Sequence, residues 1–335
     1  YIKMCGIFGF SYIDKKKLIN YSDVKKDIGL FTKLNKIRGS DTFGVSISSD
    51  KENFIYKVNT DPILAIQRKD YKLFLQQSLE NLSKKDQNKI CVIGQTRLVT
   101  NGTKFLYSNN QPIITKYITG VHNGIIINLK DEEQSKTPNL EGYGVKSDSL
   151  EFYENLSKIN EKKEKFFENY LNYLKNIVGN YSIAFKLLDS SKIIISSNCG
   201  SLYYFFDRDL KKFIFSSEKN FLIKFIKKSK LFEKNSSNFE GKIIKVINQS
   251  IIFDEKEYFI EQLNHNTSEF SKINLNLNKN EYTIFDNFSE SQENLKNLKK
   301  CNKCILPETY PFINFDNNGV CNFCNSYETQ EYKGD

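Results

Sequence analysis

The chain is long, rich in aromatic residues and basic: it has 335 residues, of which 39% are hydrophobic and 14% aromatic, and its formal net charge is +9. This length predicts one large domain and a smaller one. The lysines stand mostly singly among asparagines and glutamates, which indicates a solvated surface rather than a groove for nucleic acid. No apolar run approaches the roughly 18 residues of a membrane span and no charged-then-apolar leader is visible, so we expect no membrane partner and no secretory signal.

The cysteines indicate a reducing compartment and a metal site. There are seven, an odd number, and four of them form two C-x-x-C pairs near the C-terminus. This pattern favours metal coordination over disulfides, so we expect a cytoplasmic protein. Cys91 and Cys199 have no such context and are expected to be buried core thiols.

Taken in chain order, the hydrophobic pattern predicts an α+β fold that begins with a buried strand around Ile7–Phe10. Helical spacing predicts helices over residues 22–37, 62–82, 148–158, 164–177 and 218–228. Short apolar runs predict strands over residues 42–48, 54–58, 90–96, 118–121, 125–127, 181–188, 192–197, 202–206, 212–216, 242–247 and 250–253. Hairpin-length connections indicate antiparallel sheets with helices on their outer faces. Residues 263–298 are polar with scattered apolar residues, which predicts a linker.

A cysteine directly after a methionine has an unusual chemical option. If Met4 were removed as an initiator, Cys5 would carry a thiol and a free α-amine on one residue. An α-amine has an ordinary pKa of about 7.7–8.0, so it can serve as the base for the thiol. The printed chain begins at Tyr1, and with Tyr1–Lys3 retained Cys5 has no free amine and is expected to be inert. The alternative interpretation is an ordinary buried cysteine at the start of a core strand.

Several short segments, in this order and at these spacings, carry a resemblance to a known family. They are Met4–Gly9, Arg38–Gly44, Gly94–Gly102, His122–Ile126 and Ser147–Ser149, followed by Gly179–Ser182, Gly200–Tyr204 and Phe215–Glu218. Together they resemble the glutaminase domain of the class II (N-terminal-cysteine) glutamine amidotransferases over residues 4–255. The resemblance implies a four-layer α-β-β-α sandwich of the Ntn-hydrolase type. It also implies hydrolysis of L-glutamine to glutamate and ammonia through a thioester on Cys5.

The resemblance assigns roles at the reacting amide. Cys5 matches the nucleophile, and Asn123 and Gly124 match the donors to the oxyanion, through a side-chain amide and a backbone N–H respectively. A donor of this kind typically stabilises the transition state by about 2.7–4 kcal/mol. The alternative for Asn123-Gly124 is an ordinary hairpin turn, because Asn-Gly is a strong turn signal. His122 is interpreted as structural, since the mechanism needs no histidine base.

Recognition of the amino-acid end of glutamine is assigned in the same way. Arg97 matches the residue that binds the α-carboxylate, a task that suits a planar guanidinium, and Thr100 matches a neighbour that shares this contact. Asp148 matches the carboxylate that binds the α-ammonium. The alternative for Arg97 is a surface ion pair. Asp148 with Glu151 also fits a capping box, and Ser147 could be the cap instead.

Supporting residues and departures complete the pattern. Arg38 and Asp41 match residues that hold the loop beside Cys5 and thereby support the site. Many relatives place an aromatic residue after the arginine and a histidine after the threonine, where this chain has Leu98 and Asn101. These departures concern details of carboxylate binding and loop closure rather than the reaction class.

The C-terminal block predicts a structural zinc site. Cys301-x-x-Cys304, sixteen residues and Cys321-x-x-Cys324 have the spacing of a four-cysteine site, in which four thiolates close a tetrahedral ion. With the intervening Ile305–Pro311, the block resembles the N-terminal cysteine motif of the N-acetyl sugar amidotransferases. That resemblance implies ATP and Mg²⁺ only in a downstream or partner synthetase domain, because this chain contains no matching phosphate loop.

These inferences divide the chain into a glutaminase domain at residues 4–262, a linker at 263–298 and a zinc segment at 299–335 that begins a synthetase domain. The expected partners are L-glutamine and a synthetase domain or subunit that passes ammonia to an acceptor such as an N-acetyl sugar, with a homo-oligomer left open. One alternative is an asparagine-synthetase-like amidotransferase, and another is a catalytically inactive module that binds glutamine or acts as a scaffold. A zinc-dependent nucleic-acid binder is disfavoured, because Lys303 is the single cation in residues 301–324.

Overall fold

The strands of the described residues form two sheets. The computed structural model describes residues 5–13, 20–49, 52–84, 89–100, 102–127, 146–161, 165–188, 190–209, 211–232, 239–266, 283–287, 299–306, 308 and 313–327. The first sheet has the order β11 (Ile244–Lys245), β9 (Tyr203–Asp207), β10 (Lys212–Ser216), β1 (Gly6–Ile13), β4 (Lys89–Arg97), β2 (Thr42–Ser48), β3 (Glu52–Val58) and β14 (Thr283–Asn287). The second has the order β13 (Phe259–Asn264), β12 (Gln249–Asp254), β8 (Lys192–Ser197), β7 (Gly179–Leu187), β6 (Ile118–Ile126) and β5 (Ile113–Ile114).

Neighbouring strands run antiparallel in both sheets, except that β14 runs parallel to β3. The helices are α1 (Tyr21–Asn35), α2 (Pro62–Ala65), α3 (Lys69–Lys84), α4 (Asp148–Glu161), α5 (Phe166–Lys175), α6 (Lys219–Lys228) and α8 (Asn322–Asn325). Two short 3-10 turns, η1 (Tyr107–Asn109) and η4 (Glu240–Lys242), lie between these elements. The predicted mixture of helices with largely antiparallel sheets is therefore confirmed.

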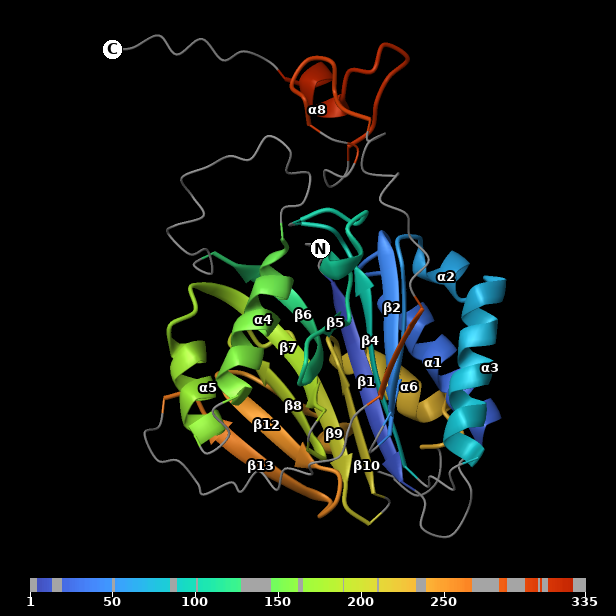
Figure 1. Cartoon of the computed structure of the whole chain (residues 1–335), viewed down its shortest axis with the longest axis vertical. Coiled ribbons are helices and arrows are strands. Elements are labelled where there is room, and N and C mark those ends of the chain that lie inside the picture. Colours follow the sequence, from blue (N-terminus) through green and yellow to red (C-terminus); the bar gives the residue numbers. More distant parts are fainter. Residues whose placement is uncertain are drawn as a thin grey trace.

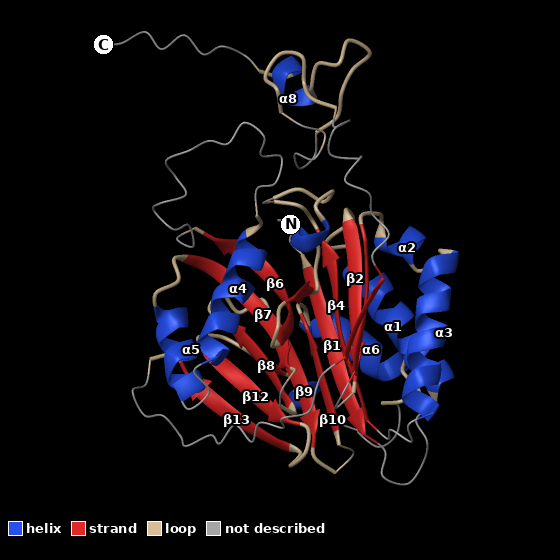
Figure 2. Cartoon of the chain, in the orientation of Figure 1, coloured by secondary structure: helices blue, strands red, loops and turns tan. Residues whose placement is uncertain are grey.

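Helices cover the outer faces of both sheets, and the two sheets pack on each other. In Figures 1 and 2, α1, α3 and α6 lie against the first sheet, whereas α4 and α5 lie against the second. Successive side chains of β1 point to opposite faces of the first sheet and so belong to two parts of the core. Ile7 faces the second sheet, whereas Phe8 and Phe10 pack against α1 and α6. Ala184 and Ile195 from the second sheet join Ile7 between the sheets.

One predicted helix is divided in two. The expected helix over residues 62–82 ends at Ala65 as α2 and resumes at Lys69 as α3. The amides of Gln67 and Arg68 bond to carbonyls three residues back, which tightens the last turn and ends the first helix. The Arg68 guanidinium and the Asp70 carboxylate then pair across the start of α3 (Nη2–Oδ2 2.8 Å).

The strand prediction fails at Asn123-Gly124. Instead of a hairpin between two short strands, β6 runs unbroken from Ile118 to Ile126 and pairs along its length with β7. Gly124 makes this possible, because its φ of +146° is a conformation that other residues rarely adopt. A Cβ there would lie 1.9 Å from the carbonyl oxygen of Asn180.

The expected linker over residues 263–298 contains regular structure at two places. Strand β13 continues to Asn264, and Thr283–Asn287 form β14 at the edge of the first sheet. An edge strand needs only backbone bonds to one neighbour, so its sequence can stay polar. Residues 267–282 and 288–298 lie outside the described residues, and the domain boundaries stay a prediction.

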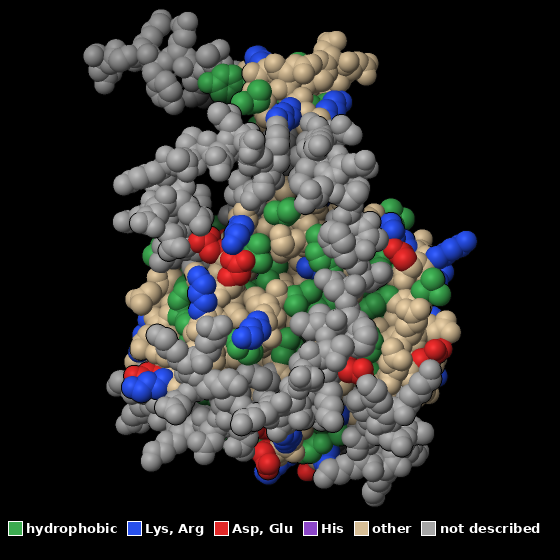
Figure 3. All heavy atoms as spheres, in the orientation of Figure 1, with side chains coloured by type: hydrophobic (Ala, Val, Ile, Leu, Met, Phe, Trp, Pro, Cys, Tyr) green, Lys and Arg blue, Asp and Glu red, His purple; other side chains and the backbone are tan. Residues whose placement is uncertain are grey.

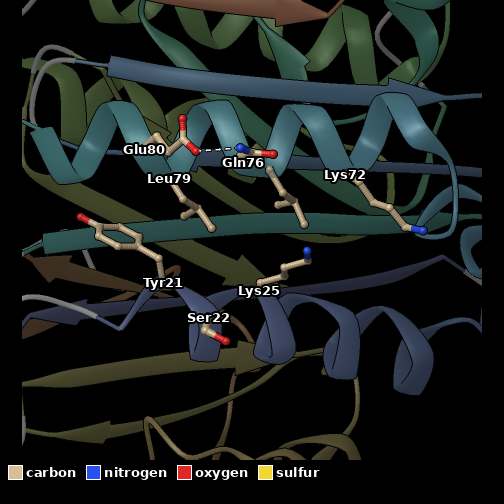
Figure 4. A pocket seen from close by; sticks show the side chains of 8 residues that line it. Tyr21, Ser22, Lys25, Lys72, Gln76, Leu79 and Glu80 are labelled. Carbon is tan, nitrogen blue, oxygen red and sulfur yellow. Dashed lines mark hydrogen bonds between the residues drawn. The ribbon is translucent and has the colours of Figure 1, made fainter.

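Scattered charged side chains (Figure 3) and a groove between two helices lie on the surface of the described residues. On the face drawn in Figure 3, described Lys and Arg side chains are scattered rather than gathered in one patch. Among the described helices, none combines the length and apolar character needed to cross a membrane. A groove between α1 and α3 (Figure 4) is lined by Tyr21, Lys25, Lys72, Leu79 and neighbouring residues, and contains none of the predicted site residues.

A buried carboxyl group makes the packing of α1 on α6 sensitive to pH. Asp27 on α1 is 2% exposed and accepts a hydrogen bond from the Ser229 hydroxyl at the end of α6. Burial raises its pKa to about 7, and the Ser229 hydrogen bond only partly opposes this. The folded pKa thus exceeds the unfolded value of about 3.9. This group therefore contributes stability that is present below about pH 4 and is lost as the pH rises to about 7.

We expect Asp27→Asn to remove this pH dependence, because an amide stays neutral and still accepts the Ser229 hydrogen bond. At pH 8 the variant should be more stable than the wild type by roughly 4 kcal/mol, and near pH 4 the difference should nearly vanish. Urea unfolding at both pH values measures this. Glu80→Gln, an exposed carboxylate on α3, serves as the control. An identical stability difference at the two pH values would contradict the assignment.

Candidate functional site

Cys5 lies at the start of β1, a central strand of the first sheet. Strand β1 pairs with β10 on one side and β4 on the other, and Ser217 after β10 anchors it by accepting a hydrogen bond from the Ile7 amide (2.9 Å). The Cys5 thiol lies 3.4 Å from the Leu98 carbonyl oxygen. Arg38 Nε donates to the Cys5 carbonyl oxygen (3.0 Å), and Arg38 also pairs with Glu218. The backbone around the thiol is thus fixed from two sides.

The electrostatic neighbours of the thiol are a cation and an anion from different elements. Burial raises the pKa of Cys5 above its ordinary value of 9.0. The positive charge of Arg97 opposes this shift most strongly among the charged groups, and the Asp148 carboxylate adds to it. A thiol with a raised pKa is mostly protonated near neutral pH, so it needs a base before it can attack as a thiolate.

Arg97 ends β4 and is held by the loop that follows β4. It is 4% exposed, and its Nη1 donates to Asn110 Oδ1 (2.9 Å). Asp41 shapes the same turn, since its carboxylate accepts from the Val99 amide (2.8 Å) and its own amide donates to the Arg97 carbonyl (2.9 Å). Thr100 is exposed on the next turn. The structure therefore brings Arg97 and Asp41 together and leaves Thr100 at the surface.

Asp148 is the first residue of α4, and backbone amides donate hydrogen bonds to its carboxylate. Its Oδ2 accepts from the Ile126 amide (3.0 Å) and its Oδ1 from the Ser149 amide (2.8 Å). The cap is Ser147, whose hydroxyl accepts from the Leu150 amide (3.2 Å), so the capping box of Asp148 with Glu151 does not form. The Asp148 carboxylate is 8% exposed and is free of a capping task.

Asn123 and Gly124 lie on β6, the strand of the second sheet that approaches β1 and β4. Asn123 is 2% exposed, yet its Nδ2 has no hydrogen-bond partner among the described residues. A buried amide donor without a partner is rare and costs free energy. An unpaired Nδ2 group is, however, what we expect of a donor whose partner is an oxygen atom of a ligand.

His122 has the structural surroundings that the sequence suggested. Its ring Nδ1 lies 2.9 Å from the Ser149 hydroxyl, and its amide donates to Gln111 Oε1 (2.5 Å). Burial lowers the pKa of its imidazole, with the Asp148 carboxylate acting in the opposite direction. A neutral, enclosed imidazole of this kind supports the turn into α4.

Sequence reasoning missed three consecutive buried amides beside the site. Asn109, Asn110 and Gln111 are 0%, 1% and 2% exposed. Asn109 accepts from the Ser147 amide (2.7 Å), Asn110 from Arg97 (2.9 Å), and Gln111 donates to Ser149 (2.9 Å). One short segment therefore positions both Arg97 and the start of α4. The run Asn-Asn-Gln-Pro was the available signal, but polar residues before a proline also fit an ordinary loop.

The four C-terminal cysteines come together as predicted. The sulfurs of Cys301, Cys304, Cys321 and Cys324 all lie within 4.8 Å of one another. The Cys301–Cys324 and Cys304–Cys321 sulfurs are 3.9 Å and 3.6 Å apart. Four sulfurs at about 2.3 Å from a tetrahedral zinc lie about 3.8 Å apart, so the cluster fits such an ion. Amides of Lys303 and Cys321 donate to Cys301 Sγ at 3.4 Å and 3.2 Å, as suits a thiolate ligand.

The two other cysteines differ from each other. Cys91 is 1% exposed, and burial raises its pKa to about 12, so the prediction of an inert core thiol is confirmed. Cys199 is half-buried and lies 3.5 Å from the Ser182 hydroxyl, so the prediction of a core thiol is wrong there. The position of Cys199 just after β8, at a strand end, explains its exposure.

Comparison with known proteins gives likeness in structure alone. No protein-family model matches the chain, and no curated protein matches it. Among solved structures, the chain is similar to glutamine phosphoribosylpyrophosphate (PRPP) amidotransferase from B. subtilis complexed with ADP and GMP, at 14% identity and a TM-score of 0.47, over 79% of this chain and 50% of that one. A structure described as the allosteric regulatory enzyme of purine biosynthesis gives 13% identity and a TM-score of 0.48 over the same shares.

A third solved structure, named as a predicted glutamine amidotransferase from Pseudomonas aeruginosa, gives 12% identity and a TM-score of 0.38, over 75% of this chain and 96% of that one. The chain spans about half the length of the first two structures. The likeness to all three is one of overall architecture.

We expect the purified chain to hold about one zinc ion per molecule, because four sulfurs close a tetrahedral site. Cys304→Ser should lower the zinc content after dialysis, since three thiolates leave the site open. Inductively coupled plasma mass spectrometry measures the content, and Cys199→Ser is the matched control, a half-buried cysteine outside the cluster. Equal zinc in Cys304→Ser and the wild type would show that the four sulfurs do not act together.

Proposed function

We propose that the chain contains a glutaminase domain in which Cys5, freed at the N-terminus, hydrolyses L-glutamine to glutamate and ammonia. The observation that carries this proposal is that a buried guanidinium, Arg97, and a buried carboxylate, Asp148, lie close enough to the Cys5 thiol for both to act on its pKa. An amino acid presents the complementary pair, a carboxylate and an ammonium. The arrangement of helices on both outer faces of two packed sheets suits the Ntn-hydrolase type that we assign to it.

The proposed reaction runs through a thioester. The Cys5 thiol gives its proton to its own α-amine, and the sulfur attacks the side-chain carbonyl carbon of glutamine. The carbon–nitrogen bond breaks, and the nitrogen leaves as ammonia with that proton. Water then attacks the thioester, the carbon–sulfur bond breaks, and the thiol regains a proton as glutamate leaves. The raised pKa of Cys5 explains why the thiol needs the amine as its base.

Asn123 and Gly124 supply the oxyanion donors in this proposal. The unpartnered Nδ2 of Asn123 and the backbone N–H of Gly124 bind the carbonyl oxygen as it becomes negative. Because both donors belong to one strand, we expect them to need little reorganisation during the reaction.

The amino-acid end of glutamine is bound by Arg97 and Asp148. Arg97 binds the α-carboxylate through its guanidinium, and Thr100, which is exposed on the next turn, shares this contact. Asp148 accepts from the α-ammonium through Oδ2, since this oxygen accepts one hydrogen bond, from the Ile126 amide, and keeps a further lone pair. Arg38 and Asp41 act on the backbone of Cys5 and of the Arg97 turn, as support rather than as reacting groups.

The ammonia is consumed elsewhere. We infer that the zinc segment begins or docks a synthetase domain that uses ATP and Mg²⁺ and passes ammonia to an acceptor such as an N-acetyl sugar. The support is the cysteine block. Its spacing fits a zinc site, and the residues between its two cysteine pairs resemble those of the N-acetyl sugar amidotransferases. We also infer a cytoplasmic protein, and the seven cysteines, which form no disulfide with one another in this structure, support this inference.

Protein expressed from Met4 should lose that methionine, begin with Cys5 and release glutamate from glutamine, whereas Cys5→Ala should release none. The reason is that both the thiol and the free amine belong to this residue. N-terminal mass and a glutamate assay measure the two properties. The chain with Tyr1–Lys3 retained is the matched control, because it keeps the thiol and blocks the amine.

Processed protein without glutaminase activity would still leave Cys5 testable by a diazoketone analogue of glutamine, which alkylates an activated thiol. Labelling of Cys5 without turnover would assign a glutaminase that is silent until its synthetase engages. Lack of both labelling and turnover would contradict the proposed function and favour an inactive module.

We expect Asn123→Asp to lower kcat by roughly 10²–10³ with a much smaller change in KM, because it replaces the oxyanion donor by an acceptor of the same shape. Asn123→Ala should give a loss of similar size. Since the Nδ2 group has no partner among the described residues of the free protein, the Ala variant should unfold near the wild-type temperature. A kcat within threefold of wild type in both variants would exclude Asn123 from the oxyanion site.

A further inference from the structure

Gln95, two residues before Arg97 on β4, has a buried polar atom without a partner among the described residues. Gln95 on β4 is 1% exposed, and its Nε2 donates to the His122 carbonyl oxygen on β6 (2.6 Å). Its Oε1 is buried and makes no hydrogen bond with any described group. Buried side-chain acceptors are nearly always paired, so we expect a bound ligand to supply a hydrogen-bond donor to this atom.

The orientation of the Gln95 amide is fixed by its neighbour. A rotated amide would place Oε1 against the His122 carbonyl oxygen, and two acceptors repel each other. Nε2 must therefore face His122, and Oε1 must be the atom left over. The residue after His122 is Asn123, whose Nδ2 is the unpartnered donor described above.

Strand register places Gln95 on the same face as Arg97, one step further into the interior. In the β1–β4 pairing, Gly6 lies opposite Thr96 and Ile7 opposite Gln95. Thr96 points to the helix side, because its hydroxyl bonds to the Asn35 carbonyl of α1 (2.8 Å). Its neighbours Gln95 and Arg97 therefore face the second sheet. Cys5, which precedes Gly6, is a diagonal neighbour of Gln95 across the two strands, within reach of a long side chain.

We propose that Gln95 Oε1 accepts a hydrogen bond from the carboxamide nitrogen of glutamine while Asn123 Nδ2 donates to the carboxamide oxygen. This assignment rests on the proposed function and adds a residue that distinguishes an amide from its product. A carboxamide has one acceptor oxygen and two N–H donors. Its oxygen can pair with the unpaired donor Asn123 Nδ2, and one of its N–H groups can pair with the unpaired acceptor Gln95 Oε1. When the carbon–nitrogen bond breaks, the departing ammonia keeps N–H donors and the contact with Gln95. The carboxylate of glutamate offers only acceptors and is repelled there.

The test compares two substrates that form the same thioester, glutamine and the γ-methyl ester of glutamate. The ester presents an oxygen leaving group without a donor. Gln95→Met keeps the length of the side chain and removes the acceptor. In the full chain expressed from Met4, we expect kcat/KM for glutamine to fall at least tenfold and that for the ester to change less than threefold. Gln95→Glu, which keeps an acceptor oxygen and can donate to His122 when protonated, should retain most of the amide-to-ester ratio.

Thr96→Val is the matched control, because it removes an equally buried hydrogen bond from the other face of the same strand. Its amide-to-ester ratio should equal that of the wild type. Two results would mean that Gln95 only supports β6, and either would overturn this assignment alone. One is an equal loss of kcat/KM on both substrates in Gln95→Met, and the other is loss of the amide-to-ester ratio in Gln95→Glu. A wild-type protein that turns over neither substrate would overturn the proposed function and this assignment with it.

Discussion

The site depends on the pairing of β1 with β4, because this register sets Cys5 across from Arg97. The pairing is held by close contact that larger residues would prevent. A Cβ at Gly94 on β4 would lie 2.4 Å from the Phe8 ring on β1, and one at Gly9 on β1 would lie 2.5 Å from the Val92 carbonyl oxygen on β4. A slip by one residue would exchange the two faces of β1 and bury Ile7 and Phe8 on the wrong sides. The hydrophobic core therefore fixes the position of the thiol before any polar contact does.

Polar contacts then make the buried charges tolerable. A buried guanidinium or carboxylate is costly unless other groups satisfy it. The Asn110 side chain accepts a hydrogen bond from Arg97, and one backbone amide donates a hydrogen bond to each oxygen of the Asp148 carboxylate. These hydrogen-bond partners are neutral, and they hold the charged groups in place. The Asp148 and Asp41 carboxylates also act on Arg97 through their charge.

The sequence predicts those elements whose pattern is set by one-sided burial. Helix α1 follows its apolar spacing to within two residues at either end, and the four C-terminal cysteines meet as their spacing requires. The failures have a common cause in contacts that are remote in the chain. Gly124 stays in a strand because the Asn180 backbone lies against it, and Thr283–Asn287 become a strand because β3 has an open edge. The buried amides Asn109–Gln111 are recognisable only when Arg97 and Ser147 are seen beside them.

The cysteines show how neighbours decide the chemistry of one side chain. Cys91 lies among apolar strands, where burial suppresses ionisation and leaves a packing residue. Cys301 has three other sulfurs within 4.8 Å and accepts backbone N–H hydrogen bonds, an environment that suits a metal ion. Burial raises the pKa of Cys5 as well, but a cation, Arg97, and an anion, Asp148, also act on this thiol with opposite effects. In the proposed reaction the thiol therefore needs a base, and the α-amine of Cys5 itself supplies it.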